Sequence, residues 1–495
     1  MARLMLGIDQ STQGTKVLLF DGAGRLYHRF SKNHHQLINS RGWVSHDLTE
    51  IWHNILILVT QAQQLATANG DEIVGIGITN QRESAAAWSR VDGHPLAKTV
   101  VWQCARATAL CDQIAQRGVA ATVQAKSGMP LSPYFSAAKF AWLLKNESAV
   151  QTAAAHHELC LGTMDSWLIY QLTAGRSFKT EPSNACRTQL LNLETLDWDP
   201  ELCAIFDVPE ESLGTVVHSN DLFGMTDVDG RLNRTVPIYS VLGDSQAALF
   251  GQHCVNFGDV KATYGTGSSI MMNVGQHPVR SKNGLMASVA WCLDGKADYV
   301  LEGNVNYSGA VVKWLQENLN LIDSPAETGA LAVKANPRDQ TCLVPAFSGL
   351  GAPYWNDKAQ AVVWGMTRTT GKPEFVKAAL NSIAYQINDV IQQMQRDTGC
   401  QRNALKVDGG VTKNQYLMQF QSDITATQLL IPNFEELSGF GTVYVAGMAL
   451  ELYTPTTYQQ DVSYKAYQPQ MTSEQRDFNL ETWHHAISIV NRNFQ

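Results

Sequence analysis

The stretch Leu4-Met-Leu-Gly-Ile-Asp9-Gln-Ser-Thr-Gln-Gly14-Thr-Lys16-Val-Leu-Leu-Phe20 predicts a β-hairpin at the start of the chain. Its two apolar runs are typical of strands, and the Gly, Ser and Thr residues between them are typical of a turn. A loosely similar pattern follows the midpoint, where Asp259–Thr263 leads through Tyr264-Gly-Thr-Gly-Ser-Ser269 into Ile270–Asn273. A hairpin near the start of each half suggests one supersecondary plan used twice, although two hairpins alone do not establish a duplication.

Strands and helices are expected to alternate outside the two hairpins. The expected strands are Ile73–Thr79, Ile238–Leu242 and Leu405–Val407, and the expected helices are Ser136–Leu144, Met164–Leu172, Gly309–Leu319 and Glu374–Arg396. This alternation indicates the α/β fold class. A chain of 495 residues is too long for one ordinary core and predicts two domains of roughly 250 residues each. We place the boundary just before Asp244, which gives domains at residues 1–243 and 244–495.

The bulk composition excludes several classes of protein. Hydrophobic residues make up 44% of the chain and charged residues 17%, which is normal for a globular enzyme. The net charge of −8 provides no basic field for nucleic acid or for an anionic membrane. Nine scattered cysteines without a Cys-x-x-Cys pair favour neither a disulfide framework nor a zinc ribbon. With no signal peptide and no apolar stretch of about 18–20 residues, we expect a soluble, cytoplasmic protein without a membrane span.

Three glycine-containing loops are candidate phosphate or nucleotide sites. In the first hairpin, Asp9 can hold Mg²⁺ through water while the amides and hydroxyls of the following turn face phosphate oxygens. Tyr264-Gly-Thr-Gly267 and Val407-Asp-Gly-Gly410, the latter followed by Asn414, permit close approach of a ligand to bare backbone. Each loop alone is equally well explained as an ordinary turn. The first loop is neither a Walker A loop nor a Rossmann fingerprint, which disfavours those two nucleotide folds.

Asp244 and the run Asn80-Gln-Arg-Glu83 are candidates for catalysis and substrate binding. Asp244 follows the expected strand Ile238–Leu242 and opens a helix-like run, so it is either a helix N-cap or a base in a cleft. Arg82 can donate to one hydroxyl of a polyol and Glu83 can accept from another. The alternative is a surface ion pair, which contributes under about 1 kcal/mol. Trp102 and Tyr134 offer an aromatic wall, although aromatic residues are more often part of a core.

Short motifs along nearly the whole chain match one known family. The chain resembles the FGGY carbohydrate kinases, most closely the glycerol kinases among them, and the motifs together are highly specific. They include Gly77-Ile-Thr-Asn-Gln-Arg-Glu83, Val101-Trp-Gln-Cys104, Pro133-Tyr-Phe-Ser136, Arg187-Thr188, Gly243-Asp244, Tyr264-Gly-Thr-Gly267, Leu301-Glu-Gly303, Gly349-Leu-Gly-Ala-Pro-Tyr-Trp355 and Val407-Asp-Gly-Gly410.

The resemblance implies a fold, an activity and a set of site residues. The fold is a pair of ribonuclease H-like domains, as in actin, hexokinase and Hsp70, with a cleft between them. The activity is ATP-dependent phosphorylation of a terminal hydroxyl of a small polyol or sugar, with Mg²⁺ near Asp9 and Asp244 as general base. Dimers or tetramers are implied as well. The implied polyol-binding residues are Arg82, Glu83, Trp102, Tyr134 and Asp244, with Ser245 and Ser269 in the same pocket, and the implied nucleotide-binding residues are Thr12, Gln13, Gly14, Lys16, Thr266, Gly309, Lys313, Gly410 and Asn414.

Several positions depart from the family pattern. Ser11 stands where the family has Gly, and Lys16 replaces an Arg, which keeps the charge but loses the bidentate fork. Ser245 replaces a Gln beside the base, and Ser269 replaces a Phe that packs on glycerol carbons, so the pocket should be wider and wetter. Glycerol is the first expected substrate, and a larger polyol or ketose such as erythritol, erythrulose or xylulose is the second. Residues 230–235 do not match the fructose 1,6-bisphosphate pattern, so we expect no such inhibition.

Two other function classes share this fold. One is an actin- or Hsp70-like ATPase whose output is conformational, and the other is a catalytically silent sugar sensor. An ATPase of this kind needs no Arg-Glu clamp and no base at Asp244, and intact Asp9 and Asp244 argue against a silent sensor. The kinase hypothesis is therefore favoured over both.

Overall fold

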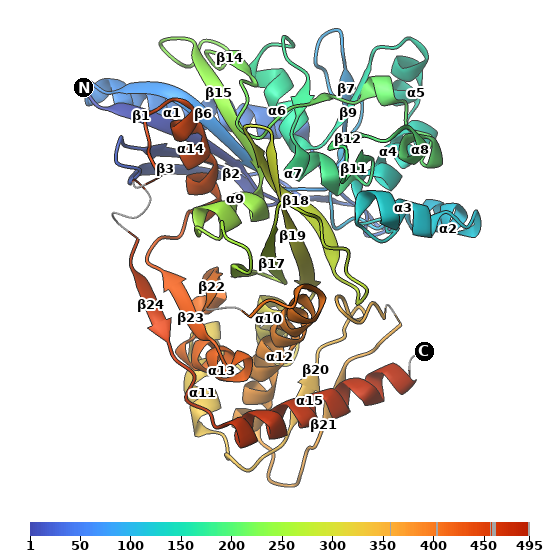
Figure 1. The fold of residues 1–495 in the computed structure, drawn as a ribbon, viewed down its shortest axis with the longest axis vertical. Helices are drawn as coiled ribbons and strands as arrows, with labels where there is room; N and C mark the ends of the chain where they lie inside the picture. The colour runs from blue at the N-terminus through green and yellow to red at the C-terminus, as the bar shows by residue number, and fades with distance from the viewer. Residues whose placement is uncertain (357, 402–403, 456, 458–461, 494–495) are drawn as a thin grey trace.

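Two large mixed sheets, one formed by each half of the chain, organise the protein (Figure 1). The computed structural model describes residues 1–356, 358–401, 404–455, 457 and 462–493. In spatial order, the first sheet consists of β14 (Gly224–Thr226), β15 (Val236–Gly243), β6 (Glu72–Asn80), β1 (Arg3–Gln10), β2 (Gly14–Phe20) and β3 (Leu26–Asn33). The second consists of β18 (Met286–Leu293), β19 (Lys296–Val305), β17 (Ser268–Gly275), β16 (Val260–Tyr264), β22 (Ala404–Asp408), β23 (Gln428–Pro432) and β24 (Tyr464–Tyr467).

The same strand plan is used in both sheets. Strand β1 pairs antiparallel with β2 and parallel with β6, and β6 pairs parallel with β15. Strand β16 likewise pairs antiparallel with β17 and parallel with β22, which pairs parallel with β23. Both predicted hairpins are therefore confirmed, and the repeated topology that they suggested is present. Every strand and helix expected from the sequence is found, with ends shifted by two residues at most.

Helices cover both large sheets, and five small sheets of two or three strands complete the part of the fold that the structure describes. The helices are α1 (Leu48–Ala68), α2 (Thr108–Gln116), α3 (Ala120–Ser127), α4 (Ser136–Asn146), α5 (Ser148–Ala155), α6 (Met164–Leu172), α7 (Pro182–Ala185), α8 (Pro200–Ile205), α9 (Asp244–Gly251), α10 (Gly309–Glu317), α11 (Thr328–Lys334), α12 (Lys372–Thr398), α13 (Gln415–Thr425), α14 (Leu437–Ala449) and α15 (Ser473–Asn493). The small sheets are β4 (Leu37–Ile38) with β5 (Val44–His46) and β8 (Thr99–Val100), β7 (Ala86–Ser89) with β9 (Leu159–Gly162), β10 (Lys179–Thr180) with β13 (Thr215–Val216), β11 (Leu191–Asn192) with β12 (Asp197–Trp198), and β20 (Cys342–Val344) with β21 (Val362–Trp364).

Local sequence explains where the longest helix begins and ends. Pro373 lies in the first turn of α12, where its missing N–H is not needed, and Glu374 accepts a hydrogen bond from the Gly371 N–H. The helix stops at Gly399, which adopts the left-handed conformation with φ of 67°. Its buried face, which includes Ile383 and Ile387, packs into the core of the second half. The helix therefore supports the sheet that carries β16 and β17.

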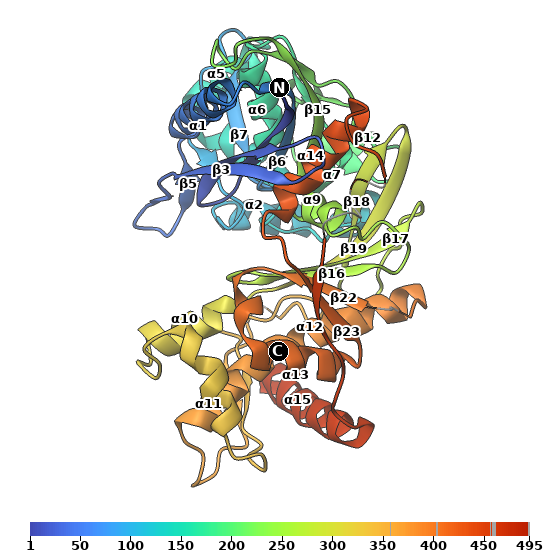
Figure 2. The same cartoon turned by 90° about the vertical axis from the view of Figure 1, so that its left-hand side faces the viewer.

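Helix α14 comes from the end of the chain but packs on the first sheet. It lies beside β6 and α9, as Figure 2 shows, and the Thr442 hydroxyl donates to the Ile78 carbonyl at 2.8 Å. A Cβ atom on Gly441 would lie 1.9 Å from the Ala247 carbonyl oxygen, so only glycine permits this approach. The division at residues 1–243 and 244–495 stays a prediction, with α9 and α14 of the second stretch packed against strands of the first.

Two further sequence expectations concern cysteines and membranes. Within the described residues all nine cysteines are free thiols, and only Cys400 is not buried. No helix in the described ranges has both the length and the apolar character needed to cross a bilayer.

Candidate active site

A buried cluster of charged side chains follows the end of β6. Arg82 and Glu83 come directly after this strand and are only 5% and 2% exposed. The alternative of a surface ion pair is therefore wrong. Glu83 has a φ of 59°, a left-handed conformation that a non-glycine residue adopts rarely and that usually marks a functional constraint.

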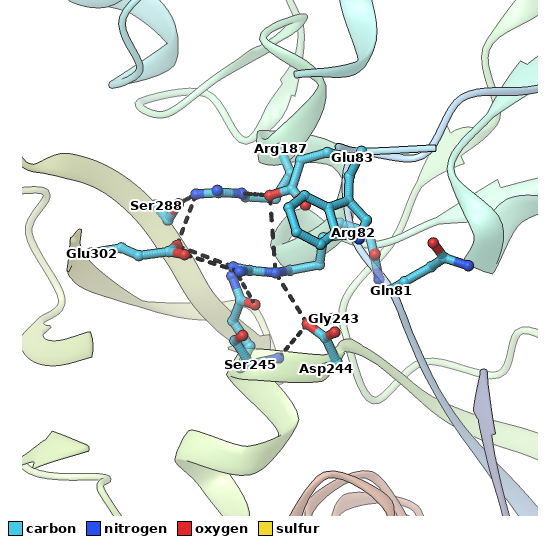
Figure 3. A network of polar contacts seen from close by, with 12 residues as sticks. Gln81, Arg82, Glu83, Arg187, Gly243, Asp244, Ser245, Ser288 and Glu302 are labelled. Carbon is cyan, nitrogen blue, oxygen red and sulfur yellow. Dashed lines mark hydrogen bonds and ion pairs between the residues drawn. The ribbon is translucent and has the colours of Figure 1, made fainter. Parts of the chain in front are cut away.

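Glu302 of β19 and Arg187 complete this cluster (Figure 3). The Arg82 guanidinium donates to both Glu302 oxygens, at 3.0 and 2.9 Å, and Arg187 Nη1 donates to Glu302 Oε2 at 2.8 Å. Arg187 Nε also donates to Glu83 Oε1. Burial alone would raise the pKa of Glu302, but the guanidinium groups of Arg187 and Arg82 outweigh it and lower the pKa to about 2. A strand of the second half thus holds the Arg82 side chain of the first half.

Asp244 lies at the accessible edge of this cluster. Its Oδ1 atom is 3.2 Å from Arg82 Nε and accepts a hydrogen bond from the Ser245 N–H at 2.6 Å. The Asp244 side chain is 38% exposed, whereas those of Arg82 and Glu302 are 5% and 0% exposed. Gly243 is the N-cap of α9 and Asp244 is its first helical residue, so the N-cap alternative is wrong. The carboxylate is held by an arginine and still has an accessible face.

Trp102 and Tyr134 form an aromatic pair beside the cluster. Their rings meet edge to face at 5.7 Å between centroids. Burial and the Glu83 carboxylate raise the pKa of Tyr134 well above its usual value, so its hydroxyl stays protonated and can donate. The Trp102 Nε1–H donates to the Thr12 hydroxyl at 2.9 Å, which connects this pair with the turn of the first hairpin.

The first hairpin carries two charged side chains near its turn, Asp9 in β1 and Lys16 in β2. Burial is the main cause that raises the pKa of Asp9 to about 6; Lys16 acts against it, and the nearby carboxylates of Asp244 and Glu436 act with it. Lys16 Nζ lies 3.9 Å from Asp9 Oδ2 and donates to Glu436 Oε2 at 2.7 Å. A Cβ on Gly14 would lie 2.8 Å from the backbone oxygen of the neighbouring strand, so this position requires glycine. Thr12 and Gln13 occupy the open tip of the turn.

The nucleotide candidates of the second half gather around one large cavity. It has a volume of about 1500 Å³ and is lined by residues of α10, α11 and α13, among them four predicted nucleotide residues, Gly309, Lys313, Gly410 and Asn414. The Thr266 carbonyl accepts hydrogen bonds from the N–H groups of the residues before and after Gly309, at 2.9 and 3.0 Å. The loop of the second hairpin is therefore tied to the start of α10.

The two serines that depart from the family pattern take different positions. Ser245 lies beside Asp244 (Figure 3). Ser269 lies in β17 opposite Asn304 of β19, and its hydroxyl is a buried atom without a hydrogen-bond partner in the described part of the chain. Neither position contradicts the sequence expectation.

Arg187 and Glu302 were not assigned a role from the sequence. Both lie within motifs used for the resemblance, but their partners are 104 and 220 residues away in the chain. One signal was available, because Glu302 directly follows the apolar run Tyr299-Val-Leu301 of β19. A charge in such a strand requires a buried partner.

Comparison with known proteins places the chain in a family. The N-terminal domain profile of the FGGY family of carbohydrate kinases matches residues 4–251, and the C-terminal domain profile matches residues 260–450. The chain belongs to the FGGY family of carbohydrate kinases. It is therefore a two-domain kinase of the actin and hexokinase type.

Relatives within the FGGY family match over nearly the full length. The chain is 42% identical to glycerol kinase 1 of Thermotoga maritima, with 98% of each chain covered. It is 39% identical to a glycerol kinase of Burkholderia pseudomallei, covering 98% of this chain and 97% of the other. A crystal structure of Plasmodium falciparum glycerol kinase with ADP superimposes with a TM-score of 0.93 at 33% identity. The match covers 99% of this chain and 98% of the other. A xylulose kinase from Lactobacillus acidophilus shares the fold, with a TM-score of 0.88 at 21% identity. The match covers 99% of this chain and 98% of the other.

Proposed function

We propose that this kinase transfers the γ-phosphoryl group of ATP to a terminal hydroxyl of glycerol and so forms glycerol 3-phosphate. The observation that carries the proposal is the position of Asp244, the accessible carboxylate of an otherwise buried charge cluster. The similarity to full-length proteins named glycerol kinase supports glycerol as the acceptor.

Asp244 acts as the general base in this mechanism. It takes the proton of the attacking hydroxyl while the oxygen of that hydroxyl bonds to the γ-phosphorus and the bond to ADP breaks. Arg82 Nε, 3.2 Å away, fixes the orientation of the carboxylate. Because Glu302 holds the other end of the same guanidinium, the base is positioned before substrate arrives.

Arg82, Glu83, Trp102 and Tyr134 bind the polyol. Glu83 accepts from a hydroxyl with the oxygen that Arg187 leaves free, and Tyr134 donates from its protonated phenol. The edge of the Trp102 ring and the ring of Tyr134 cover the carbon chain. ATP binds across the cavity of the second half, against Gly309, Lys313, Gly410 and Asn414, with its phosphates toward Thr266 and toward Thr12, Gln13, Gly14 and Lys16 of the first hairpin.

Asp9 would hold Mg²⁺ together with the ATP phosphates. The residues fit this ion, because burial and two neighbouring carboxylates raise the pKa of Asp9 and a cation relieves that crowding of negative charge. Carboxylate oxygens are hard ligands of the kind that Mg²⁺ prefers, and a single protein carboxylate suffices when phosphates supply the rest. When bound, the ion offsets phosphate charge.

A tetritol or ketose is the second candidate acceptor. The buried Ser269 hydroxyl without a partner favours it, because a substrate with an additional hydroxyl satisfies a group that glycerol leaves unpaired. A cytoplasmic location and a homo-oligomeric state also belong to the proposal, on family resemblance, and sedimentation velocity tests the latter.

A substrate panel tests the proposed function. ADP release is measured with MgATP and glycerol, erythritol, erythrulose or xylulose, and the product is identified by phosphorus NMR. We expect the highest kcat/KM with glycerol. A value for another acceptor at least about tenfold higher, equal to 1.4 kcal/mol of transition-state binding, would reject glycerol. ADP release that no acceptor stimulates would instead favour the conformational ATPase.

A further inference from the structure

Lys139 is a fully buried lysine that the proposed mechanism does not use. It lies in the first turn of α4 and has an exposed fraction of 0%. A cation is unfavourable at this place, because burial removes its hydration and the start of a helix carries partial positive charge. A lysine kept here despite both effects requires specific partners.

The partners of Lys139 are the backbone carbonyls of Tyr134 and Phe135. Its ammonium group donates to both, at 3.2 Å in the case of Phe135, and lies 6.0 Å from the centroid of the Tyr134 ring. No side chain caps α4, whose N-cap is Phe135. A single ammonium group thus binds the backbone carbonyls of the two residues that precede this helix.

The rings of these same two residues contact the charge cluster and its aromatic wall. Tyr134 packs edge to face on Trp102, and the Arg187 guanidinium lies 5.2 Å from the centroid of the Phe135 ring. Lys139 therefore fixes the backbone of two residues. The ring of one, Tyr134, forms a wall of the polyol site, and the ring of the other, Phe135, contacts Arg187.

Lys139 also balances the charge of the cluster. Glu302 accepts hydrogen bonds from both guanidinium groups and is also near the buried Lys261, whereas the hydrogen bond that Glu83 accepts in this cluster comes from Arg187. Burial lowers the pKa of Lys139 to about 7, and Glu83 is the strongest influence that opposes this shift. The other ionisable groups near the ammonium are Cys104 and Cys111, which also favour its charge, and Arg106, which opposes it.

We propose that Lys139 is a positioning residue of the polyol site, which fixes the Tyr134 ring through the carbonyls of Tyr134 and Phe135 and offsets the charge of Glu83. This inference rests on the proposed function in one respect, that Tyr134 and Glu83 contact the acceptor. It predicts that loss of the ammonium group weakens binding of the polyol and leaves binding of ATP unchanged.

The test compares Lys139→Met with Lys145→Met. Both lysines lie in α4, but Lys145 is exposed. We expect Lys139→Met to raise the KM for the polyol about tenfold, with the KM for ATP within about twofold. The melting temperature should change little, because relief of the desolvation of a buried charge opposes the cost of leaving two backbone carbonyls without their donor. Lys145→Met should match the parent in all three.

A double-mutant cycle with Tyr134→Ala shows whether Lys139 acts through Tyr134. If it does, Lys139→Met raises the polyol KM by a smaller factor when the Tyr134 ring is already absent, and the remaining rise reports the effect of Lys139 on Glu83. Full additivity would overturn the proposed route. A merely structural role predicts a lower melting temperature and parallel changes in both KM values, which would also overturn the proposal.

Lys139→Gln covers the case in which Lys139→Met is insoluble. It keeps a donor but loses the charge, so an intermediate rise in polyol KM is expected, and a value within twofold of the parent contradicts the proposal. All variants are assayed with the best acceptor of the panel. The ranking of acceptors tests the proposed function, whereas the ratio of the polyol KM of each variant to that of the parent tests the inference.

Discussion

The two halves of the protein share one strand plan but end their corresponding strands differently. In the first half, β6 runs parallel to β1 and leads into Arg82 and Glu83. In the second half, β22 runs parallel to β16 in the same way and leads into Gly409 and Gly410. The equivalent edge of each sheet therefore carries charged side chains in one half and bare backbone in the other.

This difference supports the proposal that one fold serves two kinds of ligand. A polyol has several hydroxyl groups that both donate and accept, so it is recognised by paired charged groups such as those joined by Glu302. A nucleotide presents a flat base and a ribose that bind against backbone lacking side chains. Changes in each half should consequently affect different steps, and the following predictions are ordered from the largest expected effect to the smallest.

Asp244→Asn should have the largest effect, and it should be confined to phosphoryl transfer to the polyol. The amide cannot take the proton of the acceptor, so kcat for polyol-dependent ADP release should fall by about 10²–10⁴-fold. Binding of an ATP analogue, measured by calorimetry, should change by less than about twofold. Asp112→Asn changes the exposed Asp112 of α2 and serves as the control. Turnover unaltered by Asp244→Asn would exclude Asp244 as the base.

Glu302→Gln should destabilise the fold, because it breaks the link from the second sheet to Arg82 and Arg187. Removing one partner of a buried ion pair leaves an uncompensated charge and costs about 3–5 kcal/mol. The free energy of unfolding in urea measures this loss. Glu302 has a pKa of about 2 in the folded protein, below its ordinary 4.5. Its contribution is therefore fully present above pH 4.5 and is lost as the pH falls toward 2.

Glu194→Gln is the matched control for this change. Glu194 is 68% exposed and pairs with Arg280 at 3.0 Å, and such a surface pair contributes under about 1 kcal/mol. If both variants lose the same stability, the buried cluster does not connect the halves in the way described.

Gly409→Ala and Gly410→Ala separate folding from nucleotide binding in the second half. Gly409 has a φ of 99°, and a Cβ there would lie 2.1 Å from the Tyr264 carbonyl oxygen, so Gly409→Ala should lower the free energy of unfolding by about 1–3 kcal/mol. A Cβ on Gly410 meets nothing within 4 Å. Gly410→Ala should keep the stability of the parent and raise the KM for ATP severalfold. Identical effects of the two variants would contradict the assignment of bare backbone to the nucleotide.

The smallest expected effect is the pH dependence of kcat/KM for ATP. We expect this dependence to arise from the first hairpin and not from the second. Asp9 has a pKa of about 6 and takes up a proton below that pH. Because Mg²⁺ competes with this proton, kcat/KM for ATP should fall as the pH drops below 6, and more Mg²⁺ should move the midpoint lower. Asp9 lies in β1, and the corresponding strand of the second hairpin, β16, contains no carboxylate. A midpoint that does not depend on Mg²⁺ would exclude Asp9 from the metal site.

Much of the fold could be predicted from the sequence because its signals are local. The hairpins, the strand Ile73–Thr79 and the helix Met164–Leu172 are each specified by a short pattern of apolar residues and turn residues. The packing of α14 on the first sheet could not be predicted in this way, since no local pattern tells which half of the protein a buried helix will join.

The candidate site likewise contains residues that a local pattern predicts and residues whose roles depend on distant contacts. Arg82 and Glu83 were predicted from their place at a strand end, and the structure brings them to Asp244. The roles of Arg187, Glu302 and Lys139 were not predicted, because each depends on contacts with distant segments or on backbone carbonyls. A single sequence records the charges but not which of them face one another.

The packing of α14 also sets an order for folding during synthesis. The first sheet is covered in part by residues 437–449, which follow the end of α9 by roughly 200 residues. At about 5–20 residues per second, a ribosome needs roughly 10–40 s to add that length. During this interval the apolar surface that Val443 later buries beside Leu18 is exposed on the nascent chain. The core of the newly made first half therefore stays incomplete until translation has passed α14, the last helix that contributes to it.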